Sequence, residues 1–129
     1  MAILVTGGAG YIGSHMVLAL SDRGEKVVVI DNLSTGFPWA LPPNVILRGG
    51  DVGDAGFVAS VIEEFGIDEI AHFAAKIVVP ESVTNPMLYY GNNTAKSRML
   101  IETAIRCGVK RFIFSSTAAV YGDVSGDPV

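Results

Sequence analysis

The sequence predicts an α/β fold, a doubly wound parallel sheet with helices on both faces. Short apolar runs rich in β-branched residues alternate with stretches of helical spacing. A glycine-rich turn joins the first apolar run to the first helical stretch. Half of the 129 residues are hydrophobic, which suits strands buried on both faces. Right-handed crossovers then give the expected strand order 3-2-1-4-5.

The expected elements follow one another in strict alternation. Strands are predicted at 3–5, 26–30, 45–47, 68–73 and 109–114. Helices are predicted at 11–23, 55–65 and 87–107, each followed by a glycine that ends it. Asp54 has the position of an N-cap for the second helix. Residues 123–128 have loop composition.

Composition and charge exclude several classes of protein. The chain carries 9 Lys and Arg against 13 Asp and Glu, a net charge of −4 without any basic block, so nucleic acid and anionic membranes are not expected partners. Cys107 is the single cysteine and cannot form an internal disulfide, which favours the reducing cytoplasm. No apolar run approaches the roughly 20 residues of a membrane span. We expect one cytoplasmic domain.

The turn from Thr6 to Gly13 is the strongest functional signal. A helix N-terminus offers free backbone N–H groups and a positive dipole, and both favour a bound pyrophosphate. Gly7 and Gly8 are expected to allow the tight turn, Gly10 the close approach of the anion, and Gly13 the packing of the helix on its strand. An ordinary loop is the alternative. The strand–turn–helix context favours a Rossmann-type dinucleotide site.

Acids and hydroxyls follow the later strands at the same expected edge of the sheet. Asp31 lies about 18 residues after Gly13, close to the spacing at which a dinucleotide domain places a carboxylate on the adenosine ribose. Its charge would repel a 2′-phosphate, so NAD is predicted rather than NADP; a solvated acid is the alternative. Ser34 and Thr35 could contact adenosine or cap a turn. Asp51 is placed to accept from the adenine amino group.

Several further positions keep two interpretations each. His72 is expected to be structural rather than a ligand. Lys76 could contact the nicotinamide ribose or face water. Asn92 and Asn93, which are poor helix formers within a predicted helix, could bond into the site or tie the helix to a loop. The hydroxyls that follow the fifth strand could contact a reacting sugar or nicotinamide, or cap a turn.

Six motifs in order resemble the extended short-chain dehydrogenase/reductase family, and among its members the nucleotide-sugar epimerases. The motifs are Thr6-Gly-Gly-Ala-Gly-Tyr-Ile-Gly13-Ser-His, Asp31-Asn-Leu33, Gly50-Asp-Val52, His72-Phe-Ala-Ala75, Tyr90-Gly-Asn-Asn93 and Phe114-Ser-Ser-Thr117-Ala-Ala-Val-Tyr121-Gly-Asp123. Related 4,6-dehydratases usually carry Thr-Asp-Glu in the last motif, whereas this chain has Thr117-Ala118-Ala119. The resemblance therefore favours an epimerase.

The resemblance also implies roles for individual residues. Around the adenosine and pyrophosphate it places Gly7, Gly10, Tyr11, Ile12 and Gly13 at the pyrophosphate, Asp31, Asn32, Leu33, Ser34, Thr35 and Gly36 around adenosine, and Asp51 and Val52 beside adenine. Along the rest of the cofactor it places Phe73, Ala74, Ala75, Lys76, Ile77 and Ser115, with Asn92 as a brace. Thr117 is implied to be the hydroxyl that assists a catalytic tyrosine. In that mechanism NAD takes the C4 hydride of a UDP-sugar, the 4-keto sugar turns over, and the hydride returns to the other face. UDP-glucose and UDP-galactose are thereby interconverted.

Two departures from the family pattern stand out. The family's lysine after the fourth strand would fall at Ile77, and here it lies one residue earlier, at Lys76. No Tyr-x-x-x-Lys motif occurs, because Tyr121 is followed at the fourth position by Ser125. We therefore expect the chain to be the N-terminal, NAD-binding part of a longer enzyme, inactive alone and lacking the sugar-binding domain. An unfinished sheet edge favours a homodimer. A non-catalytic NAD-binding or redox-sensing module, or another nucleotide-sugar dehydrogenase, is the alternative.

Overall fold

The computed structural model describes residues 2–122 and contains one parallel sheet in the order β3-β2-β1-β4-β5. Its strands are β1 (Ala2–Thr6), β2 (Val27–Asp31), β3 (Ile46–Gly49), β4 (Ile67–His72) and β5 (Arg111–Phe114). The predicted fold class and strand order are confirmed. Strand bounds differ from the predicted ones by at most two residues, which is the usual uncertainty of element ends. The loop predicted for 123–128 lies outside the described residues.

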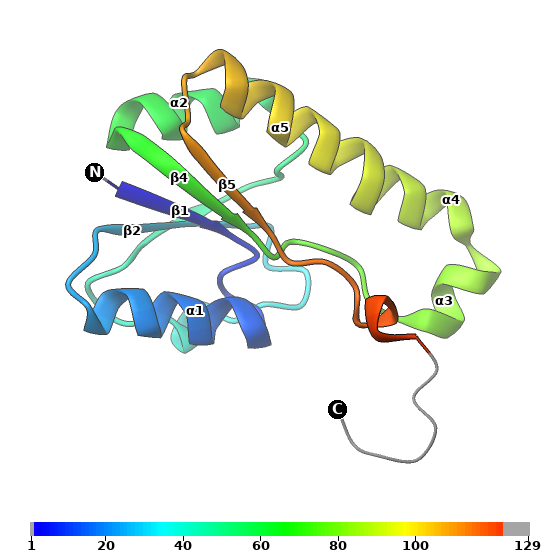
Figure 1. Cartoon of the computed structure of the whole chain (residues 1–129). Helices are drawn as coiled ribbons and strands as arrows, with labels where there is room; N and C mark the ends of the chain where they lie inside the picture. The colour runs from blue at the N-terminus through cyan, green and yellow to red at the C-terminus, as the bar shows by residue number, and fades with distance from the viewer. Residues whose placement is uncertain (1, 123–129) are drawn as a thin grey trace.

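Helices cover the two faces of the sheet unequally (Figure 1). α1 (Tyr11–Asp22) lies on one face, and α2 (Ala55–Phe65) and α5 (Lys96–Arg106) lie on the other. Each strand sends alternate side chains to the two sides: Leu4 belongs to the core beneath α2 and α5, whereas Val5 belongs to the core beneath α1. None of the helices within residues 2–122 has the length and hydropathy of a membrane-spanning segment.

The local sequence explains why the elements begin and end where they do. All five residues of β2 are buried, as expected for a strand covered on both faces. Asp54 caps α2, because its side chain accepts from the Phe57 N–H at 3.0 Å. Gly66 ends that helix with a φ of 63°. Both predictions for α2 are confirmed.

The structure differs from the expected elements after β4. A short helix, α3 (Val79–Thr84), occupies a segment in which no helix was predicted. The helix predicted at 87–107 is present in three parts, which are α4 (Pro86–Tyr89), a π-helical segment (Tyr90–Ala95) and α5. α3 and α4 lie beyond the carboxyl ends of the strands (Figure 1). The local sequence of α3 does not predict a helix, because proline and β-branched residues disfavour helices.

Candidate functional site

The glycine turn leads from β1 directly into α1 at the carboxyl edge of the sheet. Gly7 has a φ of 68° and its N–H donates to the Ile30 carbonyl at 2.8 Å, which fixes the turn against β2. Gly10 is the N-cap of α1, and no side chain caps that helix end. The first helical N–H groups have no acceptor within the helix. An unshielded, positive helix end is thus left beside the turn.

The glycines of the turn have different functions. A Cβ on Gly13 would lie 2.1 Å from the Gly7 oxygen, and one on Gly8 would lie 2.8 Å from the Val29 side chain. A Cβ on Gly10 would meet a single atom within 4 Å, the Gly7 oxygen at 3.3 Å. Gly8 and Gly13 therefore permit close packing, while a Cβ on Gly10 would crowd the Gly7 oxygen alone among the described residues. Such a cradle suits the phosphate oxygens of a dinucleotide.

Asp31 ends β2 and is buried, with 7% of its surface exposed. One carboxylate oxygen accepts from the Ala9 N–H at 2.9 Å and the other from the Leu33 N–H at 2.8 Å. The carboxylate thus joins the glycine turn to the next loop, a role that the sequence interpretation missed. An ionised carboxylate offers about four acceptor positions, so its predicted bond to ribose stays compatible with these contacts.

The loop from Asn32 to Gly36 lies against the glycine turn. The Asn32 side chain accepts from the Ser34 N–H at 3.0 Å, and Leu33 has a φ of 58°. A Cβ on Gly36 would lie 2.9 Å from Ala9, and the Phe37 N–H donates to the Ala9 carbonyl at 2.9 Å. Residues 32–35 are exposed. Their predicted contact with adenosine remains a prediction.

Asp51 follows β3, and its carboxylate bonds two partners. Its carboxylate bonds Lys96 Nζ of α5 at 2.5 Å and accepts from the Gly53 N–H at 2.8 Å. Burial opposes ionisation, but these bonds outweigh it and lower the pKa of Asp51. Val52 is 8% exposed and belongs to the core. The predicted roles of both residues beside adenine are untested.

The segment after β4 forms the other wall of the turn. A Cβ on Gly7 would lie 2.6 Å from the Ala74 nitrogen, and the Phe73 N–H donates to the Thr6 carbonyl at 2.9 Å. Lys76 holds its Nζ 3.8 Å from Glu81 in α3. An exposed ion pair of this kind is weak. Contact of Lys76 with the nicotinamide ribose and exposure of Lys76 to water both remain predictions.

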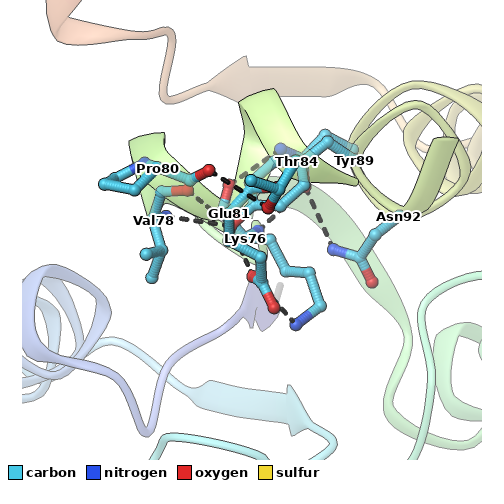
Figure 2. A network of polar contacts seen from close by, with 8 residues as sticks. Lys76, Val78, Pro80, Glu81, Thr84, Tyr89 and Asn92 are labelled. Carbon is cyan, nitrogen blue, oxygen red and sulfur yellow. Dashed lines mark hydrogen bonds and ion pairs between the residues drawn. The ribbon is translucent and has the colours of Figure 1, made fainter. Parts of the chain in front are cut away.

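The two asparagines in the π-helical segment have different partners. Asn93 bonds the backbone N–H and carbonyl of Lys76, each at 2.8 Å, and so ties the helix to the loop. Asn92 donates to the Asn93 side chain at 3.0 Å. Figure 2 shows Asn92 beside the polar network of α3, in which the Tyr89 hydroxyl lies 2.7 Å from Glu81. Desolvation and the Glu81 carboxylate raise the pKa of Tyr89.

The hydroxyl residues after β5 reach the same edge of the sheet. Ser115 donates its backbone N–H to the His72 carbonyl at 3.1 Å, which continues the β4–β5 pairing. The Thr117 carbonyl accepts from the Val120 N–H at 3.2 Å, and Thr117 is exposed. The roles predicted for Ser115 at the cofactor and for Thr117 at the sugar remain predictions.

His72 is structural in this fold, as expected. It is 2% exposed and lies between Thr6 Oγ1, 2.6 Å from Nδ1, and Ser97 Oγ, 2.8 Å from Nε2. Burial lowers the pKa of His72 to about 4. The ring is therefore neutral at pH 7.

Comparison with known proteins agrees with this architecture. Residues 3–129 match the model of the NAD dependent epimerase/dehydratase family. The chain belongs to this family. It is 50% identical over 127 residues to the UDP-glucose 4-epimerase of Azospirillum brasilense, a match that covers 98% of the chain and 36% of that protein.

Solved structures of epimerases in the family have the same fold. The Thermus thermophilus UDP-glucose 4-epimerase, in complex with NAD, superimposes with a TM-score of 0.91 at 39% identity, covering 99% of this chain and 42% of that one. The Thermotoga maritima enzyme with UDP-glucose gives a TM-score of 0.89 at 39% identity, covering 100% of this chain and 42% of that one. The chain thus spans well under half the length of these relatives.

Proposed function

We propose that the chain is the NAD-binding portion of a UDP-glucose 4-epimerase. The observation that supports this most strongly is the open cradle at Gly10, next to uncapped N–H groups of α1. The pyrophosphate of NAD lies there. The sheet order places β2 and β3 on one side of the turn and β4 and β5 on the other, so the two nucleotide halves lie on opposite sides of β1.

Asp31 identifies the adenosine half of the site. Its carboxylate accepts from the ribose hydroxyls, with Asn32 to Gly36 around the nucleoside and Asp51 and Val52 beside adenine. The nicotinamide half then lies over β4 and β5, along Phe73 to Lys76 and Ser115, with Asn92 as a brace. When bound, NAD supplies the hydride acceptor for the sugar carbon.

The reacting sugar lies at the end of β5. Thr117 is the hydroxyl of this chain that contacts the sugar 4-hydroxyl and helps a tyrosine to take its proton. That tyrosine is not in this chain, because none of the four tyrosines has a lysine four positions later. The UDP-sugar is accordingly the partner of the longer enzyme.

Titration of the purified chain with NAD in a calorimeter tests the proposal. We expect one binding event per chain, and heat changes no larger than those of buffer would reject the NAD site. The coding sequence beyond Val129 tests the epimerase assignment separately. A Tyr-x-x-x-Lys motif there would support the enzyme, whereas a stop codon would support a non-catalytic module.

The proposal also includes a cytoplasmic location and a homodimer. The lone cysteine, Cys107, supports the first, since it cannot form an internal disulfide. The position of β5 at one end of the described sheet supports the second, because unpaired edges favour association.

A further inference from the structure

A continuous chain of polar contacts runs from the end of β1 to the loop after β4. Thr6 Oγ1 lies 2.6 Å from His72 Nδ1, and His72 Nε2 lies 2.8 Å from Ser97 Oγ. Ser97 donates to the Asn93 carbonyl at 2.5 Å, and the Asn93 side chain holds Lys76. Four separate segments of the chain are thereby joined.

The direction of each bond follows from counting donors. Ser97 has one hydroxyl proton, which it gives to Asn93, so it must accept from His72 Nε2–H. His72 is neutral, which leaves Nδ1 as an acceptor for the Thr6 hydroxyl. The donor and the acceptor of each of these bonds are thereby assigned. A closed arrangement of this kind resists displacement of its members.

Asn93 is the member that reaches the site. Its carboxamide oxygen accepts from the Lys76 N–H and its nitrogen donates to the Lys76 carbonyl, both at 2.8 Å. This paired contact can be made by an amide but not by a carboxylate, which lacks a donor. The loop that it holds begins with Phe73 and Ala74, which lie directly against Thr6 and Gly7 of the glycine turn.

Asn93 lies in the π-helical segment and reaches this loop from there. The widened turn at Tyr90–Ala95 separates α4 from α5, and such bulges occur often at functional sites. Asn93 lies within it and makes the contact to Lys76, while Ser97, one turn later in α5, makes the contact to His72.

We propose that Asn93 is a positioning residue for the nicotinamide half of the site, and that Ser97 and His72 hold it in place. This inference rests on the proposed function. Asn93 fixes the loop 73–76 on the β4 side of the glycine turn. The adenosine half, on the β2 side, does not depend on it.

Calorimetry with two ligands separates this role from general stability. NAD occupies both halves of the site and ADP only the adenosine and pyrophosphate part. For Asn93→Asp we expect NAD affinity to fall at least tenfold and ADP affinity to change less than twofold. Asn44→Asp is the matched control, because it adds the same charge at an exposed position bonded to Ser21. It should change neither affinity.

The outcomes are distinct. Equal losses of NAD and ADP affinity, or no loss of either, would overturn the positioning role. A wild-type chain that binds ADP but not NAD would overturn it too, while one that binds neither ligand would reject the proposed function and this inference with it.

A measurement on the wild-type chain needs no variant. Amide hydrogen exchange should show the Lys76 N–H protected in the free protein, because it donates to Asn93. Exchange of this amide at the rate of an unstructured peptide would contradict the inference even if Asn93→Asp failed to fold.

Discussion

The glycines of the turn from Thr6 to Gly13 differ in the contacts that an added side chain would make. At Gly10 an added Cβ would lie 3.3 Å from the Gly7 oxygen, a tight contact that a shift of a few tenths of an ångström relieves, whereas at Gly13 it would lie 2.1 Å from the same oxygen. Gly10→Val should therefore fold, with a loss of about 1 kcal/mol for a poorer N-cap, yet lose NAD affinity at least tenfold because its side chain fills the anion cradle. Calorimetry and thermal unfolding measure the two effects.

Gly13→Val is the control for this substitution. The same side chain must displace backbone there, so we expect a loss of unfolding free energy of about 1–3 kcal/mol from overpacking. Unchanged NAD affinity in Gly10→Val would show that the pyrophosphate does not bind at this turn.

Asp31 has one observed role and one proposed role. It accepts from Ala9 and Leu33 within the chain, and the proposal adds the ribose hydroxyls. Asp31→Asn should reduce NAD affinity by about 1.5–3 kcal/mol, the value of a hydrogen bond to a charged group, and should reduce NADP affinity less, since the charge that repels the 2′-phosphate is gone. Titration with both nucleotides distinguishes the roles. Equal losses would mean that Asp31 only holds the turn.

At the scale of elements, His72 connects β1 and β4 to α5 through its two ring nitrogens. Its pKa is about 4 in the fold and about 6.5 in an unfolded chain. The unfolded state therefore binds the proton first as the pH falls. The contribution of neutral His72 to the free energy of unfolding is complete above about pH 6.5 and is lost as the pH drops toward 4.

Urea unfolding of the wild type and His72→Gln at pH 7.5 and pH 4.5 measures this loss. We expect the wild type to lose about 2–3 kcal/mol more than the variant between these pH values. Asp51 and the other carboxylates are present in both proteins, so their titration cancels. The same pH dependence in both proteins would show that His72 does not titrate with folding.

The region after β4 shows where sequence patterns stop being informative. Asn92 and Asn93 stood out as poor helix formers, with bonding to the site and to a loop both open. In the fold, Asn93 bonds the loop after β4, at Lys76, which lies 17 residues away in the sequence. α3 was not predicted because contacts with other segments stabilise it. One of them joins the Tyr89 hydroxyl to Glu81 at 2.7 Å.

For the whole molecule, the missing Tyr-x-x-x-Lys motif predicts the activity of the chain. We predict that the purified protein does not interconvert UDP-glucose and UDP-galactose, even when saturated with NAD, because none of its four tyrosines has a lysine four positions later. A coupled assay for UDP-glucose formed from UDP-galactose checks this. Measurable turnover above a no-protein control would contradict it.

The second prediction at this scale concerns self-association. β5 is the last strand on one side of the described sheet, and Ile113 and Phe114 are each 58% exposed. Light scattering at increasing protein concentration should detect a dimer. Ile113→Lys should weaken it, because a lysine on an edge strand opposes pairing. A wild-type chain that stays monomeric at high concentration would contradict the prediction.

Sequence alone determined the features that depend on neighbouring residues. Apolar periodicity identified the strands, glycines marked the helix ends, and crossover handedness predicted the sheet order that is observed. Only the tertiary structure decided which polar groups meet. Asp31 reaches Ala9 across 22 residues, Asp51 reaches Lys96 across 45, and Thr6 reaches His72 across 66. Such contacts form because packing brings distant segments together, and no local pattern encodes those distances.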